Sequence, residues 1–563
     1  MPPARTVRLA LALAAGALAV AALAQHLALS AERSALLGES RALEVDSEEL
    51  ERAIRRAEDP EVARTALARA LLAQAVEIEP EDGEARALRR RRFEQSARLA
   101  RRVLARRPAS WEAATLAGAA IYLGWSLDRD PRLLQEYRSW EEPLLLARRL
   151  APGEPEPQRY LAAAYLDLWP VLSDAKRELA RALLADALQD RRTFGGLIGP
   201  WLDVSGGDLG PVPDEAWAWA GLQTTLAGRR DWPGYCRAWT AGRRALRRGL
   251  EDRVLAGERL LRSGKLLQAR RTLLDAVASA PADRSFAELV ERALIAAPHG
   301  PARPELRRSL TGWLHWALDQ ALRGDRPLDP EALGRLRALV TGDGSGGQEE
   351  LAAAAWSHLA AGDLAAAESV EGRSELLWSD AWAPYWIVKG RFLAERDEIA
   401  PARHALALVH PDSRERAAYW LARRLVARAA VDREAAAEAR AALDALEATR
   451  WPAIEWSWKR GRARLEPWVG APADALSMTF GEVSAVGAAV ALRWDGRVLG
   501  CVPAASGRRF SFPLPVEAGL HLLELETLAG DRVWPESASL GARRPSAAGP
   551  AGATAAPPAA AGR

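Results

Sequence analysis

The histidines are the first candidates for chemistry, because imidazole is the commonest metal ligand and a frequent general base. This 563-residue chain has seven of them but contains neither an HExxH motif nor a His-x-His pair. Those spacings would place two ring nitrogens on one metal ion. Five histidines fall instead in different predicted helices and one predicted strand: His315, His358, His404, His410 and His521. We therefore predict no metal site.

Nucleophilic and acid–base catalysis also lack a sequence signature. No serine has the G-x-S-x-G context of a hydrolase nucleophile elbow. Paired carboxylates such as Glu48-Glu49 and Glu349-Glu350 lie on polar faces, where solvation explains them. We therefore predict no catalytic residue and no cofactor, and classify the chain as a non-enzyme. A remote alternative is an enzyme in which acidic residues of distant repeats converge in a groove.

The two cysteines, Cys236 and Cys501, lie far apart in different predicted domains. Neither belongs to a CxxC pair, which excludes the usual zinc-binding spacing. Two alternatives stay open for them. They form an interdomain disulfide in an oxidising compartment, or they are two buried free thiols, which is the interpretation that we favour.

Tryptophan is abundant, with 22 residues against 7 Tyr and 7 Phe. Trp313 and Trp316, and likewise Trp382 and Trp386, are spaced so that each pair shares one helix face. Such rings either pack in a core or line a groove that stacks on sugar rings and grips peptide side chains. These four are our candidate partner or glycan contacts, although helical spacing favours the core.

The charge pattern is that of a solvated helical surface. The formal net charge is only +3, and arginines alternate with acidic residues, as at Glu51-Arg52 and Glu415-Arg416. A nucleic-acid-binding protein needs a basic face with aromatic side chains that stack on bases. We find no segregated stripe of that kind and predict no nucleic-acid partner.

The N-terminus predicts the compartment. Arg5 and Arg8 precede an uncharged segment at 9–31, so we assign residues 1–31 to a signal peptide or an N-terminal membrane anchor. Ala22-Leu23-Ala24 before Gln25 favours cleavage, whereas the length of the segment favours a retained anchor, and both stay open. The positive-inside rule places the remainder outside the cytoplasm, in the periplasm or on the cell surface, tethered to the inner membrane.

The middle of the chain predicts a mainly α fold. Apolar residues at three-and-four spacing are interrupted by prolines that can begin a new helix, as at Pro80, Pro108, Pro152, Pro281 and Pro411. We predict one helical lobe at 32–193, a Gly/Pro-rich loop at 194–213, and a second lobe at 214–470. The second lobe is expected to end in a capping helix, whose apolar stripe is Trp451, Ile454, Trp458 and Leu465.

Residues around these prolines resemble the tetratricopeptide repeat. In the clearest unit, at 260–270, Gly264 would occupy the tight turn between two helices and Ala269 would allow their close approach. A second unit lies at 360–367. The resemblance implies an α-α superhelical solenoid, which buries its core by stacking hairpins. Because the prolines are irregularly spaced, a looser helical-hairpin solenoid is the alternative fold.

The period changes to two near the C-terminus, where we predict a small all-β sandwich at 473–541. Asp495-Gly496 suits a tight hairpin turn between strands. The run at 487–490 and the run at 495–503 resemble the PEGA-type, Ig-like β-sandwich of exported bacterial proteins, which implies a structural or adhesive module. Residues 542–563 are rich in Ala, Pro and Gly and predict a disordered tail.

These observations predict an exported, membrane-anchored scaffold for protein–protein interaction in the bacterial cell envelope. Its partners would be envelope proteins bound on the concave helical surface, with the membrane contacted through residues 9–31. The alternative is a glycan-binding accessory of exopolysaccharide or envelope polysaccharide assembly, which would bind polysaccharide through exposed tryptophans.

Overall fold

The computed structural model divides into two compact units, Met1–Pro213 and Asp214–Arg563, called here the N-terminal and C-terminal units. It describes residues 54, 57, 59–79, 81–128, 139–300, 303–323, 328–341, 348–414, 416–447, 450–452, 457–459, 462–469, 471–481, 487–505, 507–530, 533 and 535–542. The predicted N-terminal segment at 1–31 lies outside them, as does the predicted tail beyond position 542. Within these ranges, no helix is both long enough and apolar enough to cross a membrane.

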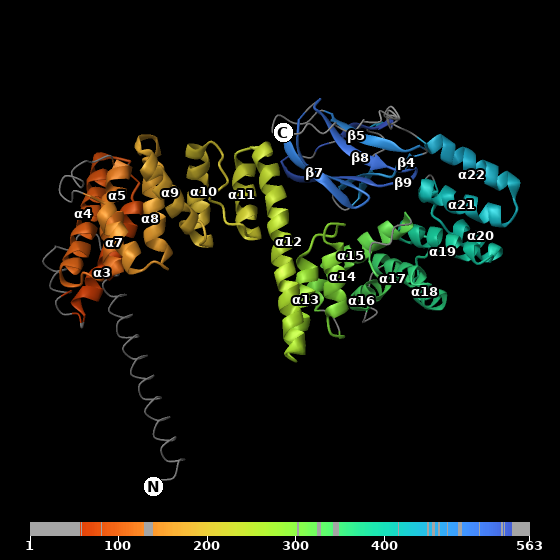
Figure 1. The fold of residues 1–563 in the computed structure, drawn as a ribbon, viewed down its shortest axis with the longest axis horizontal. Coiled ribbons are helices and arrows are strands. Elements are labelled where there is room, and N and C mark those ends of the chain that lie inside the picture. The colour runs from red at the N-terminus through yellow and green to blue at the C-terminus, as the bar shows by residue number, and fades with distance from the viewer. Residues whose placement is uncertain are drawn as a thin grey trace, which may run out of the picture. The chain divides into compact units, whose positions relative to one another are not determined.

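The N-terminal unit is helical, and neighbouring helices along the chain pack against one another (Figure 1). Its helices are α3 (Pro60–Glu77), α4 (Gly83–Arg106), α5 (Trp111–Asp128), α7 (Glu141–Leu150), α8 (Pro155–Asp167), the 3-10 turn η1 (Trp169–Val171), α9 (Asp174–Ala187) and α10 (Arg191–Ser205). Asp59 and Asp82 cap α3 and α4 by accepting hydrogen bonds from free backbone N–H groups. Leu71 and Phe93 lie in the shared core.

The predicted loop at 194–213 is wrong over its first twelve positions, which belong to α10. Asp190 caps this helix by accepting from Arg192 N at 3.2 Å. The apolar positions Phe194 and Trp201 are buried, and the glycines and Pro200 fall on the half-buried or exposed side. Apolar periodicity therefore outweighed the helix-breaking composition, and Gly206 ends the helix with a φ of 65°.

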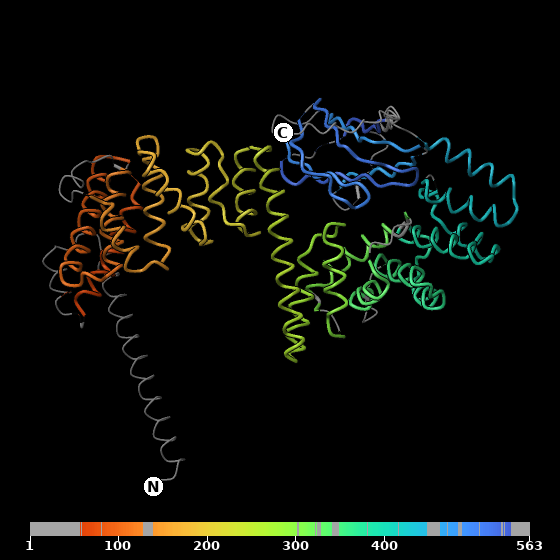
Figure 2. The backbone as a smooth tube through the Cα atoms, in the orientation of Figure 1, coloured from red at the N-terminus to blue at the C-terminus, as the bar shows by residue number. Residues whose placement is uncertain are grey.

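The C-terminal unit begins with a second helical series, whose longest member is α12 (Figure 2). The series comprises α11 (Ala216–Gly228), α12 (Trp232–Arg262), α13 (Leu266–Ser279), α14 (Ala287–Ala296), α15 (Pro304–Leu322), α16 (Pro330–Thr341), α17 (Gln348–Ala360), α18 (Leu364–Glu371), η2 (Asp380–Trp382), α19 (Ala383–Glu395), α20 (Ile399–Ala407), η3 (Pro411–Ser413), α21 (Ala417–Ala429) and α22 (Arg433–Leu446). Residues of α12 through α21 share one apolar core.

The two predicted helical hairpins are present. Gly264 lies between α12 and α13 with a φ of 76°, and Gly362 lies between α17 and α18 with a φ of 81°. Only glycine adopts such a backbone conformation without cost. Ala269 is fully buried where α13 packs against α12. The chain is thus mostly helical, with paired helices at these two of the places where the sequence resembles a repeat.

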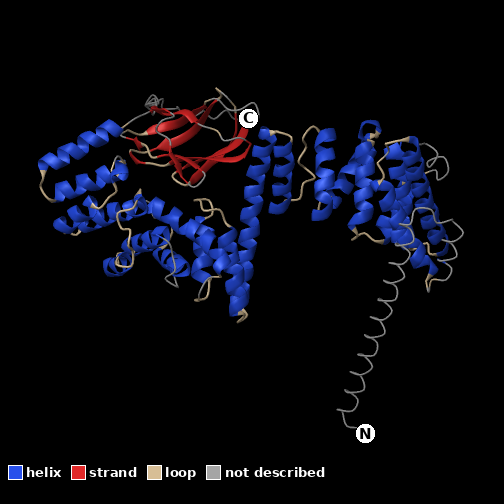
Figure 3. Ribbon diagram, turned by 180° about the vertical axis from the view of Figure 1, so that it is seen from behind, coloured by secondary structure: helices blue, strands red, loops and turns tan. Residues whose placement is uncertain are grey.

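A region of antiparallel strands, called here the β domain, follows the helices (Figure 3). Its strands are β1 (Arg450–Pro452), β2 (Ser457–Lys459), β3 (Arg462–Leu465), β4 (Trp468–Val469), β5 (Ala473–Phe480), β6 (Ala488–Trp494), β7 (Arg497–Ala504), β8 (Arg509–Val516), β9 (Gly519–Leu520), β10 (Leu523–Gly530) and β11 (Pro535–Ala542). They form sheets of order β1-β11-β5-β8 and β2-β3-β10-β6-β7, with β4 paired to β9. Side chains of both larger sheets share one apolar core.

The predicted capping helix is wrong, because three of its four stripe residues lie in strands of the β domain, and the fourth, Ile454, lies outside the described residues. Trp451, Trp458 and Leu465 lie in β1, β2 and β3 respectively. Along β3, half-buried Arg462 and Arg464 alternate with buried Ala463 and Leu465. This alternation with a period of two is typical of a strand. The run is only four residues long, which is too short to distinguish a strand from a helix by sequence. The β region therefore begins at Arg450, before the predicted boundary at 473.

The predicted hairpin turn at Asp495-Gly496 is confirmed, with φ values of 48° and 69°. Its tip contacts the helices: Arg284 N donates to Gly496 O at 3.0 Å. A Cβ atom added to Gly496 would lie 2.5 Å from Trp316 Nε1 and 2.7 Å from the Gln320 amide. The turn is thus a docking point of the β domain on α15.

We expect Gly496→Ala to destabilise the C-terminal unit more than Gly507→Ala does. Both glycines have positive φ, 69° and 66°, so either change costs about 1–2 kcal/mol in backbone strain. Only Gly496 meets neighbouring atoms, because nothing lies within 4 Å of a Cβ at Gly507. Chemical unfolding of the two variants measures the difference. Equal losses of unfolding free energy in the two variants would mean that the added methyl group at position 496 does not clash with α15.

Candidate functional site

A cavity of about 570 Å³ lies between the helices and the β domain of the C-terminal unit. Four helices (α15, α17, α19 and α21) contribute to its wall, together with β3 and β9. The apolar part of the lining consists of Ala352, Ala353, Trp356, Ala381, Pro384, Ile387, Ala418 and Leu520. The charged and imidazole groups are His315, Asp319, Arg323, Glu349, Arg416, Arg464, Glu466 and His521.

Helical spacing explains which residues reach the cavity. His315 and Asp319 are four residues apart on α15 and therefore share a face. Glu349, Ala353 and Trp356 follow at intervals of four and three on α17, so they form a second line. The cavity is consequently bordered by one face of each helix, and the β domain closes its other side.

Arg464 of β3 is one of the electrostatic links between the two sides, and the pair of Arg323 with Asp495 at 3.7 Å is another. Arg464 forms ion pairs with Asp319 of α15 at 3.0 Å and with Glu524 of β10 at 3.2 Å. Burial alone would lower the pKa of its guanidinium group, but the charges of Asp319, Glu524 and Glu466 outweigh burial and raise it. Arg464 is therefore fixed as a cation, and it holds the β domain against α15.

A second group of charges lies on the same sheet. Glu526 of β10 forms an ion pair with Arg493 at 2.5 Å and with Arg462 at 3.6 Å. Burial alone would raise the pKa of the Glu526 carboxyl group, but the two guanidinium groups outweigh it and bring the pKa below its ordinary value of 4.5. Ionised Glu526 therefore stabilises the folded state.

This pKa shift predicts a pH dependence of stability. Because the folded-state pKa of Glu526 is depressed, its contribution is complete above about pH 4.5 and is lost as the pH falls through the folded-state value. We expect the unfolding free energy of the C-terminal unit to decline below pH 4.5. Glu526→Gln should be less stable at neutral pH and should lose less on acidification. If the unfolding free energy of Glu526→Gln fell with decreasing pH as steeply as that of the wild-type chain, the depressed pKa of Glu526 would be contradicted.

The cavity is suited to binding. Arg416, at the start of α21, makes no side-chain hydrogen bond or ion pair with any described residue, so its charge is available to a ligand. Ser379 also lines the cavity, and its Oγ has no hydrogen-bond partner among the described residues. Among the residues described, no three His, Cys, Asp or Glu side chains are grouped to hold a metal ion.

The structure brings together two histidines that the sequence left apart. His315 and His521 both line the cavity, whereas His358, His404 and His410 are absent from its lining. His521 Nδ1 lies 2.7 Å from Asp495 Oδ2, and its Nε2 lies 2.8 Å from Glu517 O. Both ring nitrogens of His521 are thus engaged within the β domain, so this ring positions the turn at Asp495.

The four candidate tryptophans do not line an open groove. Trp382, Trp386, Trp313 and Trp316 are 0%, 1%, 1% and 7% exposed. Trp313 Nε1 donates to Ala280 O at 3.0 Å, so the polar edge of that ring is satisfied inside the protein. The interpretation of these rings as exposed contacts is therefore wrong, because the apolar core of the helices encloses them.

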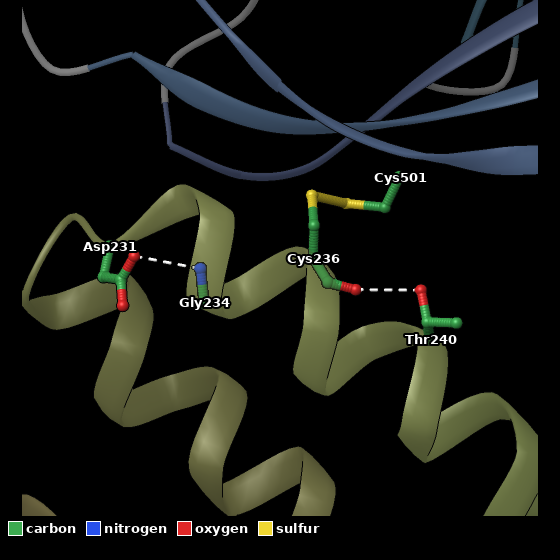
Figure 4. The surroundings of a disulfide bond; sticks show 5 residues. All are labelled: Asp231, Gly234, Cys236, Thr240 and Cys501. Atoms are coloured by element: carbon green, nitrogen blue, oxygen red, sulfur yellow. Dashed lines mark hydrogen bonds between the residues drawn. A yellow bond between two sulfur atoms is a disulfide. The ribbon is translucent and has the colours of Figure 1, made fainter. Parts of the chain in front are cut away.

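The two cysteines form a disulfide, so the interpretation as two free thiols is wrong (Figure 4). Cys236 lies in the first part of α12 and Cys501 in β7, which packs along that helix. Their Cα atoms are 5.2 Å apart, within the range that a disulfide spans, although 265 positions separate them in sequence. Asp231 caps α12 just before Cys236 by accepting from Gly234 N at 2.9 Å.

The predicted export signal and the presence of only two cysteines were the sequence signals for this bond, but they do not show that the β domain docks beside α12. Comparison with known proteins does not show this docking either. The chain matches no protein-family model, and no curated protein matches it.

Proposed function

We propose that this chain is an exported, membrane-tethered interaction scaffold of the bacterial cell envelope. The observation that carries the proposal is the disulfide between Cys236 and Cys501. Such bonds persist in oxidising compartments and are rare in the cytoplasm. The disulfide agrees with the export signal at 1–31, in which Arg5 and Arg8 precede an uncharged segment.

The proposed architecture is a tetratricopeptide-like solenoid followed by a PEGA-like β-sandwich. The hairpins at Gly264 and Gly362 support the first assignment, and the two sheets with a common core support the second. In the C-terminal unit, helices α15, α17, α19 and α21 face the β domain across the cavity. We therefore place the partner site at the cavity, with Arg416 as its cationic group and Trp356 in its apolar wall.

Two other functions are less well supported. Glycan binding through exposed tryptophans is less well supported because the four candidate tryptophans are buried in the core. In the part of the chain that the structure describes, the large aromatic residue that is exposed is Trp378, at 64%. An enzyme would need convergent carboxylates. Asp319, Glu349 and Glu466 do line the cavity, but Asp319 is ion-paired with Arg464.

The export proposal is tested by fusing reporters after Arg563. A periplasm-active phosphatase fusion should be active, and a fusion that fluoresces only in the cytoplasm should be dark. Replacing both Leu13 and Leu18 by Arg should reverse the two results, because each central charge costs about 2.5–3.5 kcal/mol of insertion free energy. Valine at the same two positions should change neither result. A bright cytoplasmic fusion of the unmodified chain would overturn the proposal.

A further inference from the structure

Helix α4 of the N-terminal unit is strongly basic. Its 24 residues include nine arginines and only two glutamates. Arg91, Arg98 and Arg102 are exposed, and their spacing of seven and four residues aligns them along one face over about 16 Å. The opposite face, with Phe93 and Ala97, is buried in the core. Helix α4 therefore carries a basic stripe, although no exposed aromatic side chain of this helix accompanies it.

Two arginines of the stripe have no anionic partner. Arg91 and Arg98 make no hydrogen bond or ion pair with any residue that the structure describes, whereas Arg107 nearby pairs with Asp59 at 3.0 Å. The cations also crowd one another. Burial lowers the pKa of Arg92, and the positive charge of Arg91 lowers it further. A surface of negative charge placed along the stripe would relieve this repulsion.

We propose that the stripe formed by Arg91, Arg98 and Arg102 rests on the anionic phospholipid headgroups of the membrane into which residues 9–31 insert. The inference rests on the proposed membrane tether. Attachment through the N-terminal segment confines the stripe to the membrane surface and raises its effective concentration there. Basic residues near such a surface are attracted within a Debye length, about 8 Å at physiological salt.

A single-stranded nucleic acid is the less suitable polyanion. Its recognition uses aromatic side chains that stack on bases beside the basic residues. The exposed face of α4 instead carries Gln95 and Ala105 between and beyond its arginines. Lipid headgroups require only the charge, which this face provides.

The test uses the full chain in nanodiscs, with Ala105→Cys carrying a polarity-sensitive fluorophore. Ala105 is exposed seven residues after Arg98, so it lies on the stripe, and the native cysteines are occupied by their disulfide. We expect a blue shift of the emission in discs that contain phosphatidylglycerol but not in neutral phosphatidylcholine discs. The shift should disappear at 1 M salt, where the Debye length is about 3 Å.

Arg91→Glu with Arg98→Glu should abolish the shift, and glutamine at both positions should reduce it. The matched control is Arg237→Glu with Arg244→Glu, which reverses two exposed arginines seven residues apart on α12 and should leave the shift intact. An unmodified chain without a shift in anionic discs would overturn the inference. A shift on adding RNA to neutral discs, without one in anionic discs, would overturn it in favour of nucleic acid. A chain that fails to enter any disc contradicts the tether itself.

Discussion

Replacing Cys236 and Cys501 by serine lowers the unfolding free energy of the C-terminal unit by up to about 5 kcal/mol. The bond closes a loop of 265 positions, and constraining so long a loop restricts the unfolded chain strongly. It also joins α12 to β7, which pack against one another. Urea unfolding followed by tryptophan fluorescence measures the loss.

The reduced wild-type chain is the control for the serine variant. Reduction breaks the same bond without changing a side chain, so the two midpoints should agree. If wild-type chain kept under oxidising conditions unfolds at the same midpoint as the variant, the bond does not stabilise the unit. The docking of the β domain would then depend on its other contacts, among them the ion pairs Arg464–Asp319 and Arg323–Asp495 and the turn at Gly496.

Replacing Trp386 by alanine should cost about 3–5 kcal/mol of unfolding free energy. The ring is 1% exposed, and its Nε1 donates to Leu377 O at 2.7 Å. The substitution therefore leaves a cavity and an unpaired carbonyl group together. Chemical denaturation of the purified chain measures the loss.

Trp378→Ala is the matched control, because this ring is 64% exposed and its removal should change stability by no more than about 0.5 kcal/mol. Similar losses in the two variants would contradict the assignment of Trp386 to the core. If Trp386→Ala kept its stability but lost partner binding, the interpretation of the four candidate tryptophans as partner contacts would be supported again.

The sequence predicted elements whose signals are local. Gly264 and Asp495-Gly496 identified turns correctly, because a positive φ selects for the residue type. The errors arose where two local signals conflicted. At 194–205 the glycines and Pro200 suggested a loop, but the buried face of α10 prevailed. At 450–465 apolar residues fitted a helical stripe, but the β domain supplied pairing partners such as β10 for β3.

The cavity could not be predicted, because its lining comes from distant parts of the chain. His315 and His521 line the same cavity only because β9 and the residue that follows it pack beside α15. The burial of the charged side chains on β3 and β10 likewise depends on the docking of the β domain on the helices. Arg464 and Glu524 form an ion pair with side chains that are only 11% and 7% exposed, and this burial depends on how the β domain packs against helices encoded far upstream. Strand register and domain docking decide which residues line the cavity and which charges are buried, and sequence periodicity does not reveal either.

In the exported chain that we propose, the disulfide between Cys236 and Cys501 fixes the β domain to α12. Acid quenching of the native cells, followed by alkylation before and after reduction, reads the state of both cysteines directly. We expect Cys236 and Cys501 to resist alkylation until they are reduced, and to appear in one linked peptide pair without reduction. Alkylation of both thiols in the unreduced sample would contradict the oxidising compartment and the proposed docking together.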